Sequence, residues 1–287
     1  MISPFDYKRP KTLQEACSLL QESNGRAKVI AGGTDLIIQL RNGDQHPSLI
    51  IDIAHLKELQ GIEESVHTLS IGAAVTHAEI AASPLIRKYG KVLSLAASQI
   101  GSPQIRNVGT IGGNVINASP AADTLPPLLV LNGIGSVVSS EGEREVPLSQ
   151  LFKGPYASAL KGNEILVRIV VEKLPAEMKG HFLRIARREA MAIARISLAL
   201  LFQVVDGLIR NVRVAPGAIL PTPQRLHEVE SFLEGRPLKD EVFREASKKV
   251  SEAMVQKSGV RPSTAYKAPV IEALFIRAIR EALEQVQ

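Results

Sequence analysis

The chain has 287 residues, of which 45% are hydrophobic and 22% charged, so it can bury a full core and is neither disordered nor fibrous. Its net charge is +5, but the Lys and Arg residues are spread along the sequence and no Trp is present to stack on bases, which argues against nucleic-acid binding. The single cysteine excludes an internal disulfide and an iron–sulfur cluster held by this chain, and the six His show no metal-ligand spacing.

The sequence also bears on the compartment. The first ten residues mix charge and Pro without the apolar segment of a signal peptide, and the longest apolar runs, such as 125–131 and 196–205, are too short to span a bilayer. We therefore expect a cytoplasmic protein without a membrane span. The basic balance then indicates a solvated basic surface or a ligand that carries phosphate.

The N-terminal segment has the pattern of a small α/β unit. Thr12 and Glu15 form the signature of a capping box, apolar residues follow at helical spacing, and Asn24 with the following glycine predicts a left-handed end. Cys17 falls on the apolar side of this helix, so it is expected in the core. Beyond it the pattern predicts a strand at 28–31, one or two helical turns at 36–40, and a strand at 48–53.

The middle of the chain mixes strands, helices and a glycine-rich stretch. Thr76 and Glu79 form a second capping-box signature. His77 lies in the first turn that this box starts, where a surface or hydrogen-bonded histidine is expected rather than a catalytic one. Residues 101–122 form a long stretch that carries Gly, Asn and Ser, and no helix or strand is predicted in it. The other predicted elements are strands at 69–73, 134–139 and 164–171 and a helix at 92–98.

The last part of the chain begins after a charged, Pro-containing segment at 173–179, which marks a predicted domain boundary. Asp206 and Gly207 separate two apolar runs, 196–205 and 208–214, which is the signal of a β-hairpin. Two amphipathic helices close the chain. We predict an α+β protein in three parts, 1–55, 56–175 and 176–287.

A glycine-rich turn follows the first predicted strand. Paired glycines let backbone N–H groups approach an anion without a Cβ in the way, and a helix start adds a favourable dipole. The turn is neither a Walker A loop nor a G-x-G-x-x-G fingerprint. From the residues alone, an anion site and a plain strand-to-helix turn stay equally open. The segment comprises Val29, Ile30, Ala31, Gly32, Gly33, Thr34, Asp35 and Leu36.

A second segment, residues 109–123, is low in charge and carries small polar groups. This composition is expected where backbone and small side chains line a polar ligand. Thr110, Asn114, Asn117 and Ser119 can donate hydrogen bonds to phosphate or hydroxyl oxygens, whereas an ionised Asp123 can only accept. An ordered loop held by its own side chains is the alternative.

No arrangement for nucleophilic or hydrolytic catalysis is present in the sequence. No Ser lies in a G-x-S-x-G elbow, Cys17 is on a core face, and no carboxylates are paired at a useful spacing. Two anion-binding loops without catalytic side chains favour a bound redox cofactor that performs the chemistry.

Both segments resemble the FAD-binding segments of the flavoprotein (medium) subunits of molybdenum hydroxylases, the xanthine dehydrogenase and carbon monoxide dehydrogenase type. The matching stretches are IAGGTDL at 30–36 and IGSPQIRNVGTIGGNVINASPAAD at 100–123, and the resemblance extends over almost the whole chain. That family is similar in fold to the vanillyl-alcohol oxidase and p-cresol methylhydroxylase flavoproteins. The resemblance implies a two-subdomain FAD-binding module followed by a C-terminal antiparallel sheet-and-helix domain.

The resemblance also implies which residues hold FAD. Residues 31–36 and 110–114 would cradle the diphosphate, and 187–193 would complete the flavin pocket. Several relatives carry an acidic residue just before the position of Ile193, where this chain has Ala192, so the acceptor that reaches the flavin stays open. No side chain is expected to be catalytic. The implied FAD residues are Val29, Ile30, Ala31, Gly32, Gly33, Thr34, Asp35, Leu36, Ile100, Thr110, Ile111, Gly112, Gly113, Asn114, Asp123, Leu166, Arg184 and Ile193.

In that family, a large subunit with the molybdenum cofactor hydroxylates the substrate, and a small subunit with two [2Fe–2S] clusters passes the electrons to FAD. The resemblance thus implies an electron-transfer subunit, in a dimer of heterotrimers, that reduces NAD⁺, a quinone or dioxygen. Gly-Gly-Thr-Asp and Thr-Ile-Gly-Gly-Asn resemble purine and xanthine members more than carbon monoxide or aldehyde members. The alternatives are a self-contained FAD oxidase of the same fold and a non-enzymatic binding protein.

Overall fold

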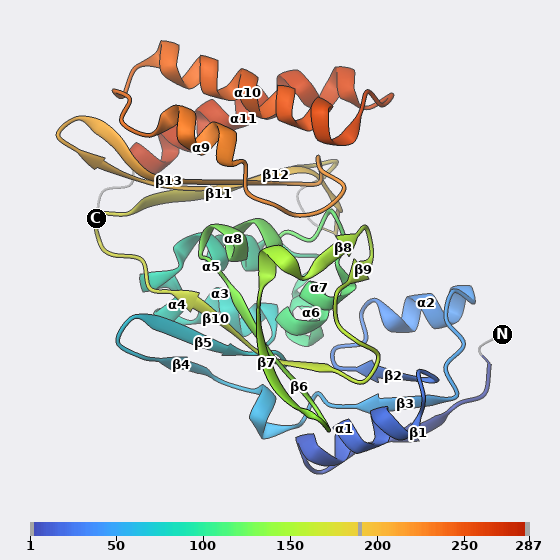
Figure 1. Cartoon of the computed structure of the whole chain (residues 1–287). Coiled ribbons are helices and arrows are strands. Elements are labelled where there is room, and N and C mark those ends of the chain that lie inside the picture. Colours follow the sequence, from blue (N-terminus) through green and yellow to red (C-terminus); the bar gives the residue numbers. More distant parts are fainter. Residues whose placement is uncertain (1–2, 189–190, 285–287) are drawn as a thin grey trace.

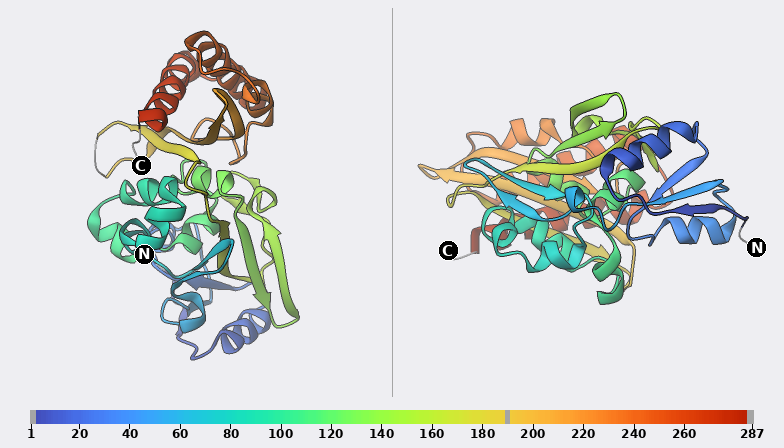
Figure 2. Two further views of the ribbon diagram at one scale, coloured as in Figure 1. Left: turned by 90° about the vertical axis from the view of Figure 1, so that its left-hand side faces the viewer. Right: turned by 90° about the horizontal axis from the view of Figure 1, so that it is seen from below.

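The computed structural model describes residues 3–188 and 191–284, and these are stacked in layers of helices and sheets (Figure 1). Helices α9–α11 cover one face of the sheet β11–β13, and the helices of the middle region lie against its other face (Figures 1 and 2). A five-stranded sheet and the N-terminal unit follow on the far side of those helices. No helix within the two described ranges is long and apolar enough to cross a membrane.

The N-terminal unit is a parallel three-stranded sheet in the order β1-β3-β2. Its first helix begins after Thr12, whose hydroxyl accepts the Glu15 N–H at 3.2 Å. The Glu15 carboxylate accepts the Lys11 N–H at 2.7 Å, so only half of the predicted capping box forms. Cys17 is buried, as expected. The elements are β1 (Asp6–Lys8), α1 (Leu13–Glu22), β2 (Ala27–Ile30), α2 (Leu36–Asn42) and β3 (Leu49–Asp52).

The first half of the middle region contains five α-helices, α3 to α7, that the sequence pattern predicts only in part. The stretch 101–122, in which no helix was predicted, contains α6 and α7. Their hydroxyl caps explain this: Ser102 accepts the Ile105 N–H, Pro103 occupies the first helical position, and Thr110 caps α7. The elements up to this point are η1 (Lys57–Leu59), β4 (Ile62–Glu64), β5 (Thr68–Gly72), α3 (His77–Ala82), α4 (Pro84–Tyr89), α5 (Lys91–Ser98), α6 (Pro103–Val108) and α7 (Ile111–Asn117).

The antiparallel sheet of this region has the order β4-β5-β10-β6-β7 and is buried on both faces of β10. Leu166 and Ile169 pack with the helices, whereas Ile165 and Val167 pack against the N-terminal unit. The sheet therefore supports the helices of the middle region on one face and the N-terminal unit on the other. Its remaining elements are α8 (Leu125–Val130), β6 (Ile134–Ser139), β7 (Gly142–Pro147), η2 (Leu148–Gln150), β8 (Phe152–Gly154), β9 (Ala157–Ser158) and β10 (Ile165–Glu172).

The C-terminal sheet is an antiparallel meander, and the predicted hairpin is confirmed. Asp206 and Gly207 have φ of 52° and 73°, which a two-residue turn between twisted strands requires. Along β12, Leu198 and Leu200 face the C-terminal helices, whereas Ala199 and Leu201 face the middle region. Burial on both faces explains the continuous apolar run. The elements are β11 (Lys179–Ala186), which was not predicted, β12 (Ala194–Val205), β13 (Leu208–Gly217), α9 (His227–Leu233), α10 (Asp240–Ser258) and α11 (Thr264–Glu284).

Candidate functional site

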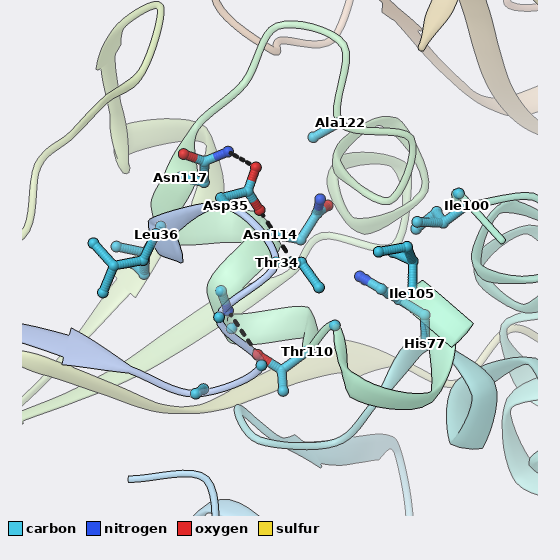
Figure 3. Close-up of a pocket in the computed structure, with 18 of the residues that line it drawn as sticks. Thr34, Asp35, Leu36, His77, Ile100, Ile105, Thr110, Asn114, Asn117 and Ala122 are labelled. Atoms are coloured by element: carbon cyan, nitrogen blue, oxygen red, sulfur yellow. Dashed lines mark hydrogen bonds between the residues drawn. The ribbon is translucent and has the colours of Figure 1, made fainter. Parts of the chain in front are cut away.

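A cleft of about 800 Å³ lies where the N-terminal unit, the middle region and the C-terminal sheet meet. Its walls come from the turn after β2, from α7, from β10 and from β11. The volume falls within the ~300–1,000 Å³ typical of small-molecule and cofactor sites. Figure 3 shows its central part, where the two glycine-rich segments face each other.

The first glycine segment contacts the second through its backbone. A Cβ on Gly32 would lie 2.0 Å from the Val108 carbonyl oxygen, so only glycine permits this approach. Gly33 has φ of +70°, in the left-handed region that favours glycine. Among the hydrogen bonds of the described ranges, none engages the N–H groups of Gly33 and Thr34. These donors remain available to a ligand at the cleft wall.

The second glycine segment forms the first turn of α7. The Thr110 hydroxyl accepts the Gly113 N–H at 3.2 Å and caps the helix. A Cβ on Gly112 would lie 2.6 Å from the Cβ of Ala73, so this glycine serves close packing. A Cβ on Gly113 would meet only the Thr110 hydroxyl, at 3.0 Å, and would otherwise face open space. Gly113 therefore keeps the cleft wall clear.

One hydrogen bond joins the two segments across the cleft. The Asn117 amide donates to Asp35 Oδ1 at 3.0 Å, and Thr34 Oγ1 donates to Asp35 Oδ2 at 3.5 Å (Figure 3). Burial raises the pKa of the Asp35 carboxyl, and these two hydrogen bonds oppose that effect. The Asp35 side chain makes no cap hydrogen bond to α2. It instead connects the two glycine segments at the rim of the cleft.

A buried ion pair lies deeper, between the middle region and the C-terminal sheet. Arg184 on β11 donates to Asp123 Oδ2 at 2.8 Å and to the Gln99 carbonyl at 2.7 Å, and both charged side chains are about 5% exposed. Burial raises the pKa of Asp123 from 3.8 to about 6, against the opposing effect of Arg184. Asp123 Oδ1 and the Ser197 hydroxyl are both buried, and neither has a hydrogen-bond partner in the described chain.

His77 departs from its expected role. It is 3% exposed, and its Nδ1 has no hydrogen-bond partner within the described ranges, so the expectation of a surface or hydrogen-bonded histidine is wrong. The ring lines the cleft. Burial, with a smaller effect of the Arg106 guanidinium, lowers the pKa of His77 from 6.5 to about 4. The imidazole is therefore neutral at neutral pH.

The structure brings the predicted cofactor residues together, with one exception. Ile111 is fully buried in the core of the middle region, because it shares the core-facing side of α7 with Val115, one helical turn further on. Ile193 is 79% exposed at the rim. The residues that line the cleft are Val29, Ile30, Ala31, Gly32, Gly33, Thr34, Asp35, Leu36, Ile100, Thr110, Gly112, Gly113, Asn114, Asp123, Leu166, Arg184 and Ile193.

The predicted flavin-pocket segment 187–193 is described only in part, because Glu189 and Ala190 lie outside the described residues. Of the rest, Met191 has φ of 53° and donates its N–H to the Gly101 carbonyl at 3.0 Å. Ala192 accepts a hydrogen bond from Arg184 at 3.1 Å through its carbonyl. Met191 and Ala192 both line the cleft.

Sequence reasoning missed two aromatic rings at this cleft, His77 and Tyr156. Tyr156 has φ of 57° and donates its N–H to the Ala118 carbonyl at 2.9 Å, which leaves its ring 67% exposed at the rim. Neither position carries a local signal. The end of β5 leads to His77 just as the end of β2 leads to Gly32, but only the fold places these two turns side by side.

Known proteins share both the sequence and the fold. Residues 3–174 match the FAD binding domain in molybdopterin dehydrogenase, and residues 181–282 match the CO dehydrogenase flavoprotein C-terminal domain. The chain belongs to this family. It is 33% identical over 288 residues to the nicotinate dehydrogenase FAD-subunit of Eubacterium barkeri, which covers 99% of this chain and 97% of that protein.

Two further relatives of this FAD-binding subunit agree. The xanthine dehydrogenase FAD-binding subunit of Escherichia coli O157:H7 is 34% identical over 280 residues, or 96% of this chain and 95% of that protein. A chain of the carbon monoxide dehydrogenase of Hydrogenophaga pseudoflava superposes with a TM-score of 0.93 at 27% identity, covering 99% of this chain and 98% of that one. The predictions of the fold class and of an FAD-binding oxidoreductase subunit are confirmed.

The cleft fits the cofactor of this family on its own geometry. Backbone N–H groups at Gly33 and Thr34 suit an anionic diphosphate, and Gly113 leaves space for it. Two buried polar atoms on the walls, Asp123 Oδ1 and His77 Nδ1, lack a hydrogen-bond partner within the described chain. A polar cofactor can satisfy such atoms, whereas an apolar ligand cannot.

Proposed function

We propose that the chain is the FAD-carrying electron-transfer subunit of a cytoplasmic molybdenum hydroxylase. In this proposal a large subunit holds the molybdenum cofactor, a small subunit holds two [2Fe–2S] clusters, and two such heterotrimers form the complex. Electrons pass from the clusters to FAD and then to an external acceptor such as NAD⁺. The observation that carries the proposal is that both glycine segments and the Asp123–Arg184 pair line one and the same cleft.

In this proposal the chain's residues hold and orient the cofactor, and FAD supplies the redox chemistry when bound. The N–H groups of Gly33 and Thr34 bind the diphosphate, with Gly113 opposite. The Asp123–Arg184 pair, at the junction with the C-terminal sheet, would supply polar contacts to the bound cofactor. Ile193, which is exposed at the rim of the cleft, would cover one face of the flavin ring.

The proposed substrate class for the complex is a purine such as xanthine. The residue patterns Gly-Gly-Thr-Asp at 32–35 and Thr-Ile-Gly-Gly-Asn at 110–114 support it. So does the similarity to a subunit named for xanthine dehydrogenase, alongside one named for nicotinate dehydrogenase. The substrate pocket itself belongs to the large subunit in this proposal.

The experiment compares the FAD-loaded chain alone with the chain mixed with the two proposed subunits. We expect flavin absorption bands from the purified chain and, at most, transfer from a reduced nicotinamide nucleotide to a dye. Oxidation of xanthine should appear only in the reconstituted complex. Steady oxidation of xanthine, an aldehyde or carbon monoxide by the chain with FAD and dioxygen would establish a self-contained oxidase instead. A colourless protein that takes up no FAD would favour a non-enzymatic binding protein.

A further inference from the structure

His77 is held rigidly by its backbone, independently of its ring. Thr76 and Glu79 close a full capping box at the start of α3, with distances of 2.7 and 3.2 Å. The His77 N–H donates to the Gly109 carbonyl at 3.0 Å. These contacts connect α3 to the segment before α7, and any residue at position 77 could make them. They therefore give no reason for an imidazole.

The ring points into the cleft. It extends from α3 toward the space between Thr34 and Ile105 (Figure 3), and its Cδ2 lies 3.3 Å from where a Cβ on Gly109 would be. It therefore stands beside the second glycine segment and faces the first. His77 is only 3% exposed, yet its Nδ1 has no hydrogen-bond partner within the described ranges. A buried polar atom without a partner destabilises the free protein.

The charge state of the His77 ring indicates which kind of contact it can make with a ligand. Because His77 is neutral at neutral pH, it presents one N–H donor and one acceptor nitrogen and adds no positive charge. The Arg106 guanidinium, which donates to the Ile100 carbonyl at 2.9 Å, disfavours a second positive charge on the His77 ring. His77 is thus suited to a directed hydrogen bond rather than to neutralising phosphate.

We infer that His77 is a direct FAD-binding residue, whose ring N–H donates to a cofactor oxygen on the ribityl chain or the adjoining phosphate. The inference rests on the proposed placement of FAD in this cleft. It explains why a polar ring occupies a buried position where an apolar side chain would pack without loss. A donor between the two glycine segments reaches the part of the dinucleotide that lies between its two ring systems.

The test measures the FAD dissociation constant of the full-length apoprotein and of three variants, His77→Leu, His77→Asn and His77→Gln. His77→Leu should weaken FAD binding about tenfold, which corresponds to about 1.4 kcal/mol. The same variant should unfold at an equal or higher denaturant concentration than the wild type without FAD, because it removes an unpartnered polar atom. The amide nitrogen of Asn lies near the position of Nδ1, and that of Gln near the position of Nε2. The variant that restores FAD affinity therefore identifies which ring nitrogen of His77 is the donor.

Binding of riboflavin, FMN and FAD to the same variant shows whether the acceptor oxygen belongs to the ribityl chain or to the phosphate. If the ribityl chain is the acceptor, His77→Leu should weaken riboflavin, FMN and FAD to the same extent. If phosphate is the acceptor, riboflavin binding should be unchanged while FMN and FAD weaken. His67→Leu is the matched control, because His67 is an exposed histidine away from the cleft, and it should leave all three constants unchanged.

Failure of this inference can be separated from failure of the proposed FAD site. If Gly113→Val loses FAD but His77→Leu binds it as tightly as wild type, the role of His77 is refuted and the site stands. If neither variant changes the affinity, FAD does not lie in this cleft and both fail. If His77→Leu destabilises the apoprotein and weakens FAD in parallel, His77 is a packing residue only.

Discussion

At the scale of single residues, the glycines of the cleft have different functions although their sequence context is alike. Gly32 and Gly112 allow backbone contacts with Val108 and Ala73, so a side chain there would disrupt the fold. Gly33 supplies a left-handed conformation. Only Gly113 combines an ordinary conformation with open space on the cleft side. It is therefore the position at which cofactor binding can be tested apart from folding.

We predict that Gly113→Val prevents FAD retention while the chain stays folded, because the isopropyl group would occupy the space proposed for the diphosphate. The FAD dissociation constant, followed by flavin fluorescence, should rise by far more than tenfold, or more than about 1.4 kcal/mol. Gly113→Ala is the graded control and should have an intermediate effect. Full flavin occupancy in purified Gly113→Val would contradict the placement of the cofactor against α7.

His77 and Asp123 should give the stability of the apoprotein opposite pH dependences. Asp123 has a raised pKa, so its stabilising protonated form is present below pH 3.8 and its contribution is lost as pH rises through about 6. His77 has a lowered pKa, so its contribution is present above pH 6.5 and is lost as pH falls through about 4. The two effects largely cancel in the wild type between these limits.

Single variants should therefore separate the two effects. As the pH rises from 4.5 to 6.5, the stability of Asp123→Asn should increase relative to that of the wild type. Over the same rise, the stability of His77→Leu should decrease relative to that of the wild type. Each change should be on the order of 2 kcal/mol. Urea denaturation of the apoproteins at both pH values measures them. The same pH dependence in both variants and the wild type would show that neither group is shifted in the folded state.

At the scale of elements, α7 depends on its cap. Seven residues that include two glycines have low helix propensity, so the Thr110 hydroxyl contributes more than it would in a longer helix. We predict that Thr110→Ala lowers the free energy of unfolding by about 1 kcal/mol and weakens FAD binding. Thr110→Ser, which keeps the hydroxyl, should restore both. A Thr110→Ala protein as stable as wild type would show that packing alone holds α7.

Elements with strong local signals were predicted correctly from the sequence. The Thr76 capping box and the Asp206-Gly207 turn each determine backbone geometry within four residues, and both are present. The helices α6 and α7 were missed because glycine content outweighed the caps at Ser102 and Thr110 in the sequence pattern. The cleft itself was predicted through its motifs and their resemblance to a family.

What local patterns could not supply was long-range proximity. His77 lies near Gly109 only because α3 and the segment before α7 pack side by side, and nothing within either stretch encodes that contact. Ile111 was assigned to the cofactor because it stands inside a motif, but the helical turn directs it into the core. A motif identifies a segment, whereas the backbone conformation decides which of its side chains face the ligand.

At the scale of the whole molecule, the cleft is completed by a sheet that comes after the FAD-binding domain in the chain. Phe182 and Arg184 are two residues apart on β11, so both point toward the middle region. Phe182 is buried in the core there, and Arg184 reaches Asp123. Leu183, between them, packs instead against the core of the C-terminal helices. Burial of one side chain thus positions another at the cleft.

The last prediction tests this coupling between packing and site. Phe182→Ala should lower the free energy of unfolding by about 3–5 kcal/mol, because it removes a fully buried ring. It should also weaken FAD binding, since β11 loses the contact that sets the position of Arg184. Leu183→Ala is the matched control on the opposite face of the same strand. It should destabilise the chain as well, but should leave the affinity of the folded protein for FAD unchanged. Equal loss of FAD affinity in both variants would mean that a general loss of stability in β11 weakens binding. A loss confined to Phe182→Ala would mean that the face of β11 toward the middle region holds Arg184 in place for the cofactor.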